Sequence, residues 1–348
     1  MRRLKAGRHS NMLMPLAPLQ KIERLPDTSD LRRWADYVEL LSLVNLDQEI
    51  SKDDMLDRIT EGKDLDARDD GVGPETGDDR EGLDDLANVA QHNDRQAHRV
   101  DEIFTHLEYR QATYKDFYPF TIIGHSDVLA VRRPLTTKHK FYMFFLLSSN
   151  LRYVPRATQE VLTDDFELVS AAVLRQCLPK GANVHVFGKN SHTPARYRGL
   201  LWDKINRLAE DLGEIVHVPT SDFRPSDSGD NGLDIVGWVP TGDDVGGYLL
   251  VFGQCACTDQ WVAKQHSSSA DAWRPIMTFK APPSNMAFVP FCLRQSNGSW
   301  SASSDIHGSI LIDRLRFIHF LQHGYTLLKG QRSYSVIQDI LRQRESVV

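Results

Sequence analysis

The chain has 348 residues, a hydrophobic content of 41% and a formal net charge of −6, which is enough for about two domains with a sizeable core. No apolar run approaches the length of a membrane-spanning helix, and the basic N-terminus lacks the apolar segment of a secretory signal. The four cysteines, at positions 177, 255, 257 and 292, do not have the spacing of a disulfide framework. We therefore expect a cytoplasmic protein that has no membrane partner.

Residues 1–60 predict a small helical N-terminal segment. Apolar residues recur at helical spacing at Leu31, Trp34, Val38 and Leu41. Ser51 and Asp54 have the spacing of an N-terminal cap, so we expect a second short helix to begin there.

Residues 61–97 predict a flexible acidic linker. Between residues 61 and 85 there are eleven acidic and three basic residues, and the segment contains no aromatic residue. Such a composition buries too little apolar surface to order itself. An alternative is that the acids imitate nucleic acid and cover a basic groove.

Residues 98–158 predict an additional α+β region. A helix passes through Ile103, Leu107 and Tyr109, and strand-like segments follow at 120–123, 128–132 and 141–147. The segment 141–147 is apolar throughout, so we expect it to be a central strand or a strand under a helix.

Residues 159–295 predict a second folded unit, and residues 296–348 a helical C-terminal region. The unit begins with a helix from residue 163, followed by a strand at 183–188 and a helix at 196–212 that ends before Gly213. Two strands then flank a Gly/Asp turn at 242–247, and a helix from residue 259 precedes a strand at 287–293. If the helix at 196–212 is an insertion, the order is helix, strand, strand, strand, helix, strand.

The two strands around the 242–247 turn carry polar side chains at adjacent ends. A turn that reads Gly-Asp-Asn-Gly-Leu-Asp, residues 229–234, places Asp234 at the start of the first strand. Gln254 lies near the end of the second strand, so we expect the two side chains to face one site. Oxygen donors of this kind suit a hard divalent cation such as Mg²⁺.

This order and these motifs resemble the PD-(D/E)xK nuclease superfamily, most closely its Mrr-like restriction endonuclease branch. In that branch a Gly-Asp-Gly-Gly-Ile-Asp turn precedes a strand, and the next strand carries Gln-x-Lys. Here Ala256 stands at the position of the lysine; some members carry the lysine on the following helix, where Lys264 lies, and Glu167 matches an acid on the first helix. The resemblance covers roughly residues 160–293 and implies an α/β fold with a restriction-endonuclease-like core, a mixed central sheet flanked by helices.

The resemblance implies a metal-dependent DNA endonuclease with Mg²⁺ or Mn²⁺ as its cofactor. Asp234, Glu167 and the side-chain oxygen of Gln254 would hold the metal ion, which polarises the scissile phosphate. Lys264 would stabilise the charge that develops on the phosphate oxygens, or orient the attacking water.

Each of these residues also has an ordinary structural interpretation. Asp234 could cap the turn, although Asp230 fits that role better, and Gln254 could be a hydrogen-bonded amide at a strand end. Glu167 could be a surface acid near a helix start, and Lys264 a solvated helix lysine. Cys255 and Cys257 suggest a zinc site, but their alternation on one strand favours small core residues.

The basic residues expected to contact nucleic acid are Lys189, Arg196, Arg198, Lys204 and Arg207, interleaved with Tyr197 and Trp202. The alternative is an amphipathic helix with a solvated basic face. A second basic group, which includes Arg314 and Arg332, lies in the C-terminal region and could bind DNA or a partner subunit.

By analogy with the superfamily, we expect an effector subunit of a prokaryotic anti-phage or restriction system, with an ATPase or helicase as the partner protein. A homo-oligomer is an open alternative. A second hypothesis is a catalytically inactive nuclease-fold module that binds nucleic acid or partner proteins. A third is a purely structural interaction protein.

Overall fold

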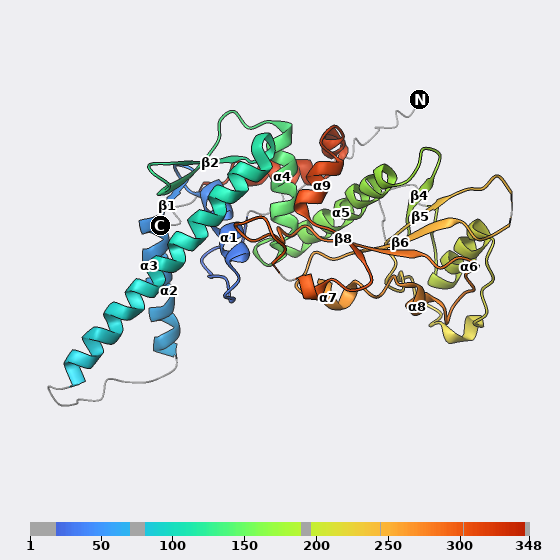
Figure 1. Cartoon of the computed structure of the whole chain (residues 1–348), viewed down its shortest axis with the longest axis horizontal. Helices are drawn as coiled ribbons and strands as arrows, with labels where there is room; N and C mark the ends of the chain where they lie inside the picture. Colours follow the sequence, from blue (N-terminus) through green and yellow to red (C-terminus); the bar gives the residue numbers. More distant parts are fainter. Residues whose placement is uncertain (1–18, 70–80, 189–195, 244, 302, 345–348) are drawn as a thin grey trace, which may run out of the picture.

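The computed structural model describes residues 19–69, 81–188, 196–243, 245–301 and 303–344 of the chain. The backbone forms a three-stranded sheet near the N-terminal helices and a five-stranded sheet in the C-terminal half. Figure 1 shows an elongated arrangement, with helix α3 (Glu81–Tyr114) at one end and the five-stranded sheet towards the other. The fold is therefore of mixed α/β class, as the sequence predicts.

The N-terminal helices begin where the sequence places their caps. The side chain of Asp30 accepts a hydrogen bond from the Arg32 amide at the start of α1 (Leu31–Val44). At the start of α2 (Lys52–Asp69), the Asp54 amide donates to Ser51 Oγ at 3.0 Å, and the Ser51 amide donates to Asp54 Oδ2 at 2.7 Å. This reciprocal pair is the predicted capping box.

The acidic segment 61–97 differs from the expected flexible linker. Residues 61–69 continue α2 and residues 81–97 begin α3, while 70–80 lie outside the described residues. Thr60 on α2 donates to Gln96 Oε1 on α3 at 3.1 Å, so the two helices are in contact. Part of each helix packs against the rest of the protein, and extending an existing helix costs much less free energy than nucleating a new one. The acidic residues therefore continue these two helices.

The small sheet has the order β1-β3-β2 and is antiparallel. Strands β2 (Phe120–Ile123) and β3 (Val128–Val131) confirm the prediction, and β1 (Glu49–Ser51) was not predicted. The strand expected at 141–147 is wrong, because these residues lie in helix α4 (Thr137–Ser148). Nearly all of α4 is buried, and an apolar run that is buried on every side has no periodicity to distinguish a helix from a strand.

The five-stranded sheet has the order β4-β5-β6-β7-β8. Its strands are β4 (Asn183–Val186), β5 (Ile235–Val239), β6 (Leu249–Cys255), β7 (Ser284–Phe288) and β8 (Ile310–Ile312). Strands β4, β5 and β6 are antiparallel neighbours, whereas β6, β7 and β8 are parallel. The predicted order of helix, strand, strand, strand, helix, strand is confirmed, and β8 adds a strand from the region expected to be helical.

Helices cover both faces of this sheet. Helix α5 (Arg156–Cys177) packs against β4, β5 and β6, and Gly237 lets it approach, because a β-carbon there would lie 2.9 Å from Leu174 on this helix. On the other face, Val236 and Phe252 pack with α6 (Leu201–Leu212) and α8 (Ala270–Trp273). Helix α6 ends at Gly213, whose φ of 63° gives the left-handed cap that the sequence predicts.

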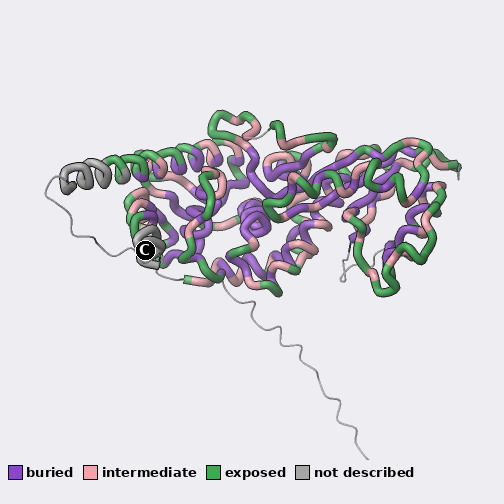
Figure 2. The backbone as a smooth tube through the Cα atoms, turned by 90° about the horizontal axis from the view of Figure 1, so that it is seen from below, coloured by how far each residue is buried: buried purple, intermediate pink, exposed green. Residues whose placement is uncertain are grey.

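The remaining elements are short helices and turns. They are the short helix α7 (Trp261–Lys264), helices α9 (Arg314–Phe320) and α10 (Ser333–Ile340), and 3₁₀ turns at Lys115–Phe117, Leu151–Tyr153, Thr220–Asp222, Ser303–Asp305 and Tyr325–Gly330. One hydrophobic cluster includes residues of α1, α4, α5, β7 and α9. Figure 2 accordingly shows buried backbone along the middle of most of the molecule.

A buried ion network joins α1 to α9 inside this cluster. Arg314 donates to both carboxylate oxygens of Asp36, at 3.0 and 3.1 Å, and Arg110 donates to Asp36 and to Glu39. Burial opposes ionisation of Asp36, but the two arginines hold its pKa below the usual range. Arg314 is fully buried, so its expected place in a C-terminal basic surface is wrong.

No helix in the described part of the chain is long and apolar enough to cross a membrane.

Candidate functional site

The predicted carboxylate and amide side chains meet at one end of the five-stranded sheet. Asp234 immediately precedes β5, and Gln254 lies near the end of β6, which is antiparallel to β5. The Asp234 amide donates to the Gly253 carbonyl at 3.0 Å, and its carbonyl accepts from the Phe187 amide at 2.7 Å. The backbone of Asp234 is therefore fixed between the ends of β4 and β6.

The acidic turn before β5 positions Asp234 without using its side chain. Asp230 Oδ1 accepts from the Gly232 amide at 2.8 Å, and Asn231 and Gly232 have positive φ angles of 52° and 75°. Asp230 is therefore the turn-capping residue, as one interpretation of the sequence held. The Asp234 side chain is 6% exposed and is turned towards the end of β6 instead.

A chain of hydrogen bonds holds the Asp234 carboxylate. Asp234 Oδ2 accepts from the Cys255 amide and from Gln254 Nε2, each at 2.6 Å. Gln254 Oε1 in turn accepts from Ser267 Oγ at 2.8 Å. Gln254 thus orients Asp234 with its amide nitrogen. Its expected role as a metal ligand through the side-chain oxygen would require this amide to rotate and its hydrogen bonds with Asp234, the Cys255 carbonyl and Ser267 to break.

Glu167 lies on α5 beside Asp234. A β-carbon built on Gly188, just after β4, would lie 3.0 Å from Glu167 Oε2 and 3.3 Å from Asp234 Oδ1. Only a glycine leaves this space open, and the two carboxylates therefore border the same small volume. Glu167 Oε2 is buried and has no hydrogen-bond partner among the described residues.

Both carboxyl groups resist ionisation. Burial is the main cause that raises the pKa of Asp234 to about 7, and the negative charge of Asp230 adds to it. Burial also raises the pKa of Glu167 well above its ordinary value, with Asp234 as the next cause. Two carboxylates that share a buried space without a paired cation are the setting in which a bound metal ion relieves repulsion.

The donor set fits Mg²⁺ through two carboxylates. Among the described residues there is no cluster of three or more His, Cys, Asp or Glu side chains arranged around a common metal position. Mg²⁺ does not need one, because it is usually held by one or two carboxylates together with waters and substrate phosphates. Glu167 Oε2 and Asp234 Oδ1 face this space and accept no hydrogen bond from the described residues.

Lys264 ends the short helix α7 and has an exposed side chain. Its positive charge lowers the pKa of Asp234, so the ammonium lies within electrostatic reach of the carboxylate pair. Trp261, three residues earlier, is buried, as the predicted helical spacing requires. Ser267 Oγ also lies 2.7 Å from the Lys264 carbonyl, which links this helix to Gln254.

The basic residues predicted to contact nucleic acid do not form one free surface. Arg196 and Arg207 both pair with Asp211 on α6, and Arg198 is exposed. Lys204 is 3% exposed and donates to the Ser228 carbonyl at 3.0 Å. Lys189 lies outside the described residues.

The aromatic residues interleaved with these basic residues are also engaged within the protein. Tyr197 is buried and donates to Asp211 at 2.9 Å, and the Trp202 ring lies against Phe223, with ring centroids 5.5 Å apart. Stacking of exposed bases on Tyr197 would therefore require the side chain to leave the core.

The cysteines behave as core residues. Cys255 and Cys257 are free thiols that pack against the main cluster, and burial raises both of their pKa values. This is the interpretation that the alternation on the strand favours over zinc binding.

Sequence reasoning missed Gly188 and Ser267. The Gly188 signal is a glycine at the end of a predicted strand, where it often marks a close approach. Ser267 has no such signal, because only the fold brings it to within 2.8 Å of Gln254.

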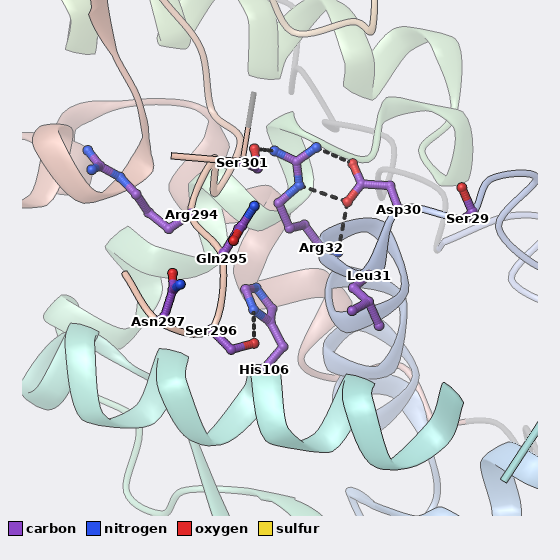
Figure 3. A pocket seen from close by; sticks show the side chains of 10 residues that line it. All are labelled: Ser29, Asp30, Leu31, Arg32, His106, Arg294, Gln295, Ser296, Asn297 and Ser301. Carbon is purple, nitrogen blue, oxygen red and sulfur yellow. Dashed lines mark hydrogen bonds and ion pairs between the residues drawn. The ribbon is translucent and has the colours of Figure 1, made fainter. Parts of the chain in front are cut away.

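A cavity of about 630 Å³ lies away from these carboxylates, between the start of α1, α3 and the loop around residues 294–301 (Figure 3). Its charged groups are already paired: Arg32 with Asp30, and Arg294 with Asp313. His106 contacts Ser296 Oγ at 3.3 Å. The cavity therefore presents no carboxylate that lacks a partner.

Comparisons of the chain with protein-family models, with curated proteins and with solved structures give no match. The functional argument therefore depends on the residues and geometry described above.

Proposed function

We propose that the chain is a metal-dependent DNA endonuclease with a restriction-endonuclease-like core. The observation that carries the proposal is the buried pair Glu167 and Asp234, which meet across the space beside Gly188 and form no ion pair with a cation of the described residues. The order of the surrounding elements supports it, since a helix covers three antiparallel strands that continue into a parallel one. The resemblance of the 229–234 turn to the Mrr-like motif is the second support.

Glu167 and Asp234 would hold the Mg²⁺ or Mn²⁺ ion. When bound, the ion polarises the scissile phosphate and offsets the negative charge that develops on it. Because the pKa values of both carboxyl groups are raised, the ion must displace protons that the pair holds near neutral pH. Metal binding should therefore release protons and strengthen as the pH rises.

The other residues of the site orient the Asp234 carboxylate or supply positive charge for the phosphate. Gln254 and the Cys255 amide hold Asp234 Oδ2, which leaves Oδ1 directed at the shared space. Lys264 supplies a mobile positive charge beside Asp234, suited to the phosphate oxygens in the transition state. Target recognition by a partner ATPase or helicase remains an analogy with the superfamily.

Cleavage of supercoiled plasmid DNA by the purified protein with Mg²⁺ or Mn²⁺ tests the proposal. We expect Glu167→Gln and Asp234→Asn to abolish cutting, and Lys264→Ala to reduce it about 100-fold. The matched controls are Glu160→Gln, an exposed acid on the same helix, and Lys329→Ala, an exposed lysine elsewhere. Cutting that survives Asp234→Asn would disprove the assignment.

The second candidate is an inactive nuclease-fold module that binds nucleic acid or partner proteins. Ala256 favours it, because this residue occupies the motif's lysine position and is buried in a small apolar cluster with Trp261. The two candidates differ in calorimetry with Mn²⁺. An inactive module predicts no binding, whereas the nuclease predicts binding that Glu167→Gln removes.

A further inference from the structure

Among the described residues, Lys204 is the one lysine that the fold buries. It lies on α6, between β4 and β5, and is not part of the motif that suggested the nuclease. An ammonium group is costly to bury unless its charge is used or compensated. The position of Lys204 therefore needs an explanation that a solvated basic helix face does not give.

The Lys204 ammonium uses one of its donor hydrogens in a hydrogen bond to the described residues. An ammonium has three donor hydrogens, and Nζ donates to the Ser228 carbonyl at 3.0 Å. Nζ also lies 5.5 Å from the centroid of the Phe187 ring. No carboxylate among the described residues forms a direct ion pair with it.

The surroundings of Lys204 nevertheless belong to the carboxylate site. Phe187 precedes Gly188, whose missing β-carbon opens the space between Glu167 and Asp234. Glu167, Asp227 and Asp230 act electrostatically on Lys204, and its charge in turn lowers the pKa of Glu167. Lys264 acts in the same way on Asp234, so each lysine is coupled to a different carboxylate.

We propose that Lys204 is a catalytic residue, which donates to a non-bridging oxygen of the scissile phosphate held beside Glu167 and Asp234. The group fits a phosphodiester anion because that ligand offers further acceptors and a directly bound negative charge to an ammonium whose one hydrogen bond to the described residues goes to a neutral carbonyl. The proposal rests on the proposed nuclease function and adds a second cation to its site. No bond to Lys204 forms or breaks, and its role is to stabilise charge.

The alternative role of Lys204 is structural, since its bond to Ser228 tethers the loop that leads into the acidic turn. Lys280 provides a matched control for that role. Its Nζ donates to the Gly213 carbonyl at 2.8 Å, but it is exposed and lies outside the carboxylate site. Lys280→Met therefore removes a comparable tether without removing a charge from the site.

The experiment measures plasmid cutting at saturating Mn²⁺ and Mn²⁺ affinity by calorimetry at pH 8. Lys204→Met keeps the length of the buried side chain without its charge, and Lys204→Gln keeps a donor for Ser228. We expect both to lose cutting about 100-fold, while Mn²⁺ affinity stays within about threefold of wild type and Lys280→Met cuts normally. Lys204→Arg, which keeps the charge, should retain at least a tenth of the wild-type rate.

Three outcomes would overturn the proposal. If Lys204→Met or Lys204→Gln cut at the wild-type rate, Lys204 would have no catalytic role, and the nuclease assignment would stand. If every Lys204 variant lost both Mn²⁺ binding and cutting, the role of Lys204 would be structural. If the wild-type protein did not cut under any of these conditions, both the nuclease function and the catalytic role of Lys204 would be disproved.

Discussion

Replacing Asp234 by asparagine should make the folded protein more stable above pH 7. The pKa of Asp234 rises from 3.8 to about 7 in the folded protein, mainly through burial. Ionisation therefore costs nothing below pH 3.8, destabilises the fold increasingly as the pH rises towards 7, and has its full effect above it. A displacement of this size corresponds to at most about 4 kcal/mol, and the negative charge of Asp230 contributes to it after burial.

Asparagine removes this cost and keeps the contacts. Its side-chain oxygen can still accept from the Cys255 amide and Gln254, and its amide nitrogen would lie towards the unpartnered Glu167 Oε2. We therefore expect Asp234→Asn to raise the free energy of unfolding at pH 8 by about 2 kcal/mol. The gain should vanish near pH 4.

Urea unfolding followed by tryptophan fluorescence between pH 4 and 8, with a chelator present, measures the effect. Asp271→Asn on α8 is the control, because the Asp271 side chain is 87% exposed and should change the free energy of unfolding little. An Asp234→Asn variant that is less stable than wild type at pH 8, or that has the same pH dependence, would refute the reasoning. Millimolar Mg²⁺ should stabilise the wild type and not the variant.

Three further substitutions test the site and the core. Gly188→Ala should abolish Mn²⁺ binding in calorimetry, because the new β-carbon would enter the space beside the carboxylates, and unchanged binding would contradict that geometry. Ser267→Ala should slow cutting about tenfold without changing the circular dichroism spectrum, since it frees the amide that orients the carboxylate. Arg314→Ala should lower the free energy of unfolding by about 3–5 kcal/mol, because it leaves Asp36 buried and only partly paired. Exposed Arg342→Ala should lower it by less than about 0.5 kcal/mol, and equal losses would disprove the role of the network.

Local patterns in the sequence determined the elements whose signals lie in neighbouring residues. The Ser51 and Asp54 cap, the glycine end of α6 and the acidic turn before Asp234 each depend on residues a few positions apart. Alternation and helical spacing also predicted the chain order of the elements that include the first four strands of the five-stranded sheet, and hence that Asp234 and Gln254 lie at the same end of it.

Only the tertiary structure decided the features that depend on burial and on distant contacts. Helix α4 has no polar face to mark its period, so its conformation follows from packing on every side. The same applies to Arg314 and Lys204, which composition places on the surface and the fold buries. The charge of a side chain is written in the sequence, whereas its partner, its solvent exposure and therefore its pKa depend on which distant residues the fold brings beside it.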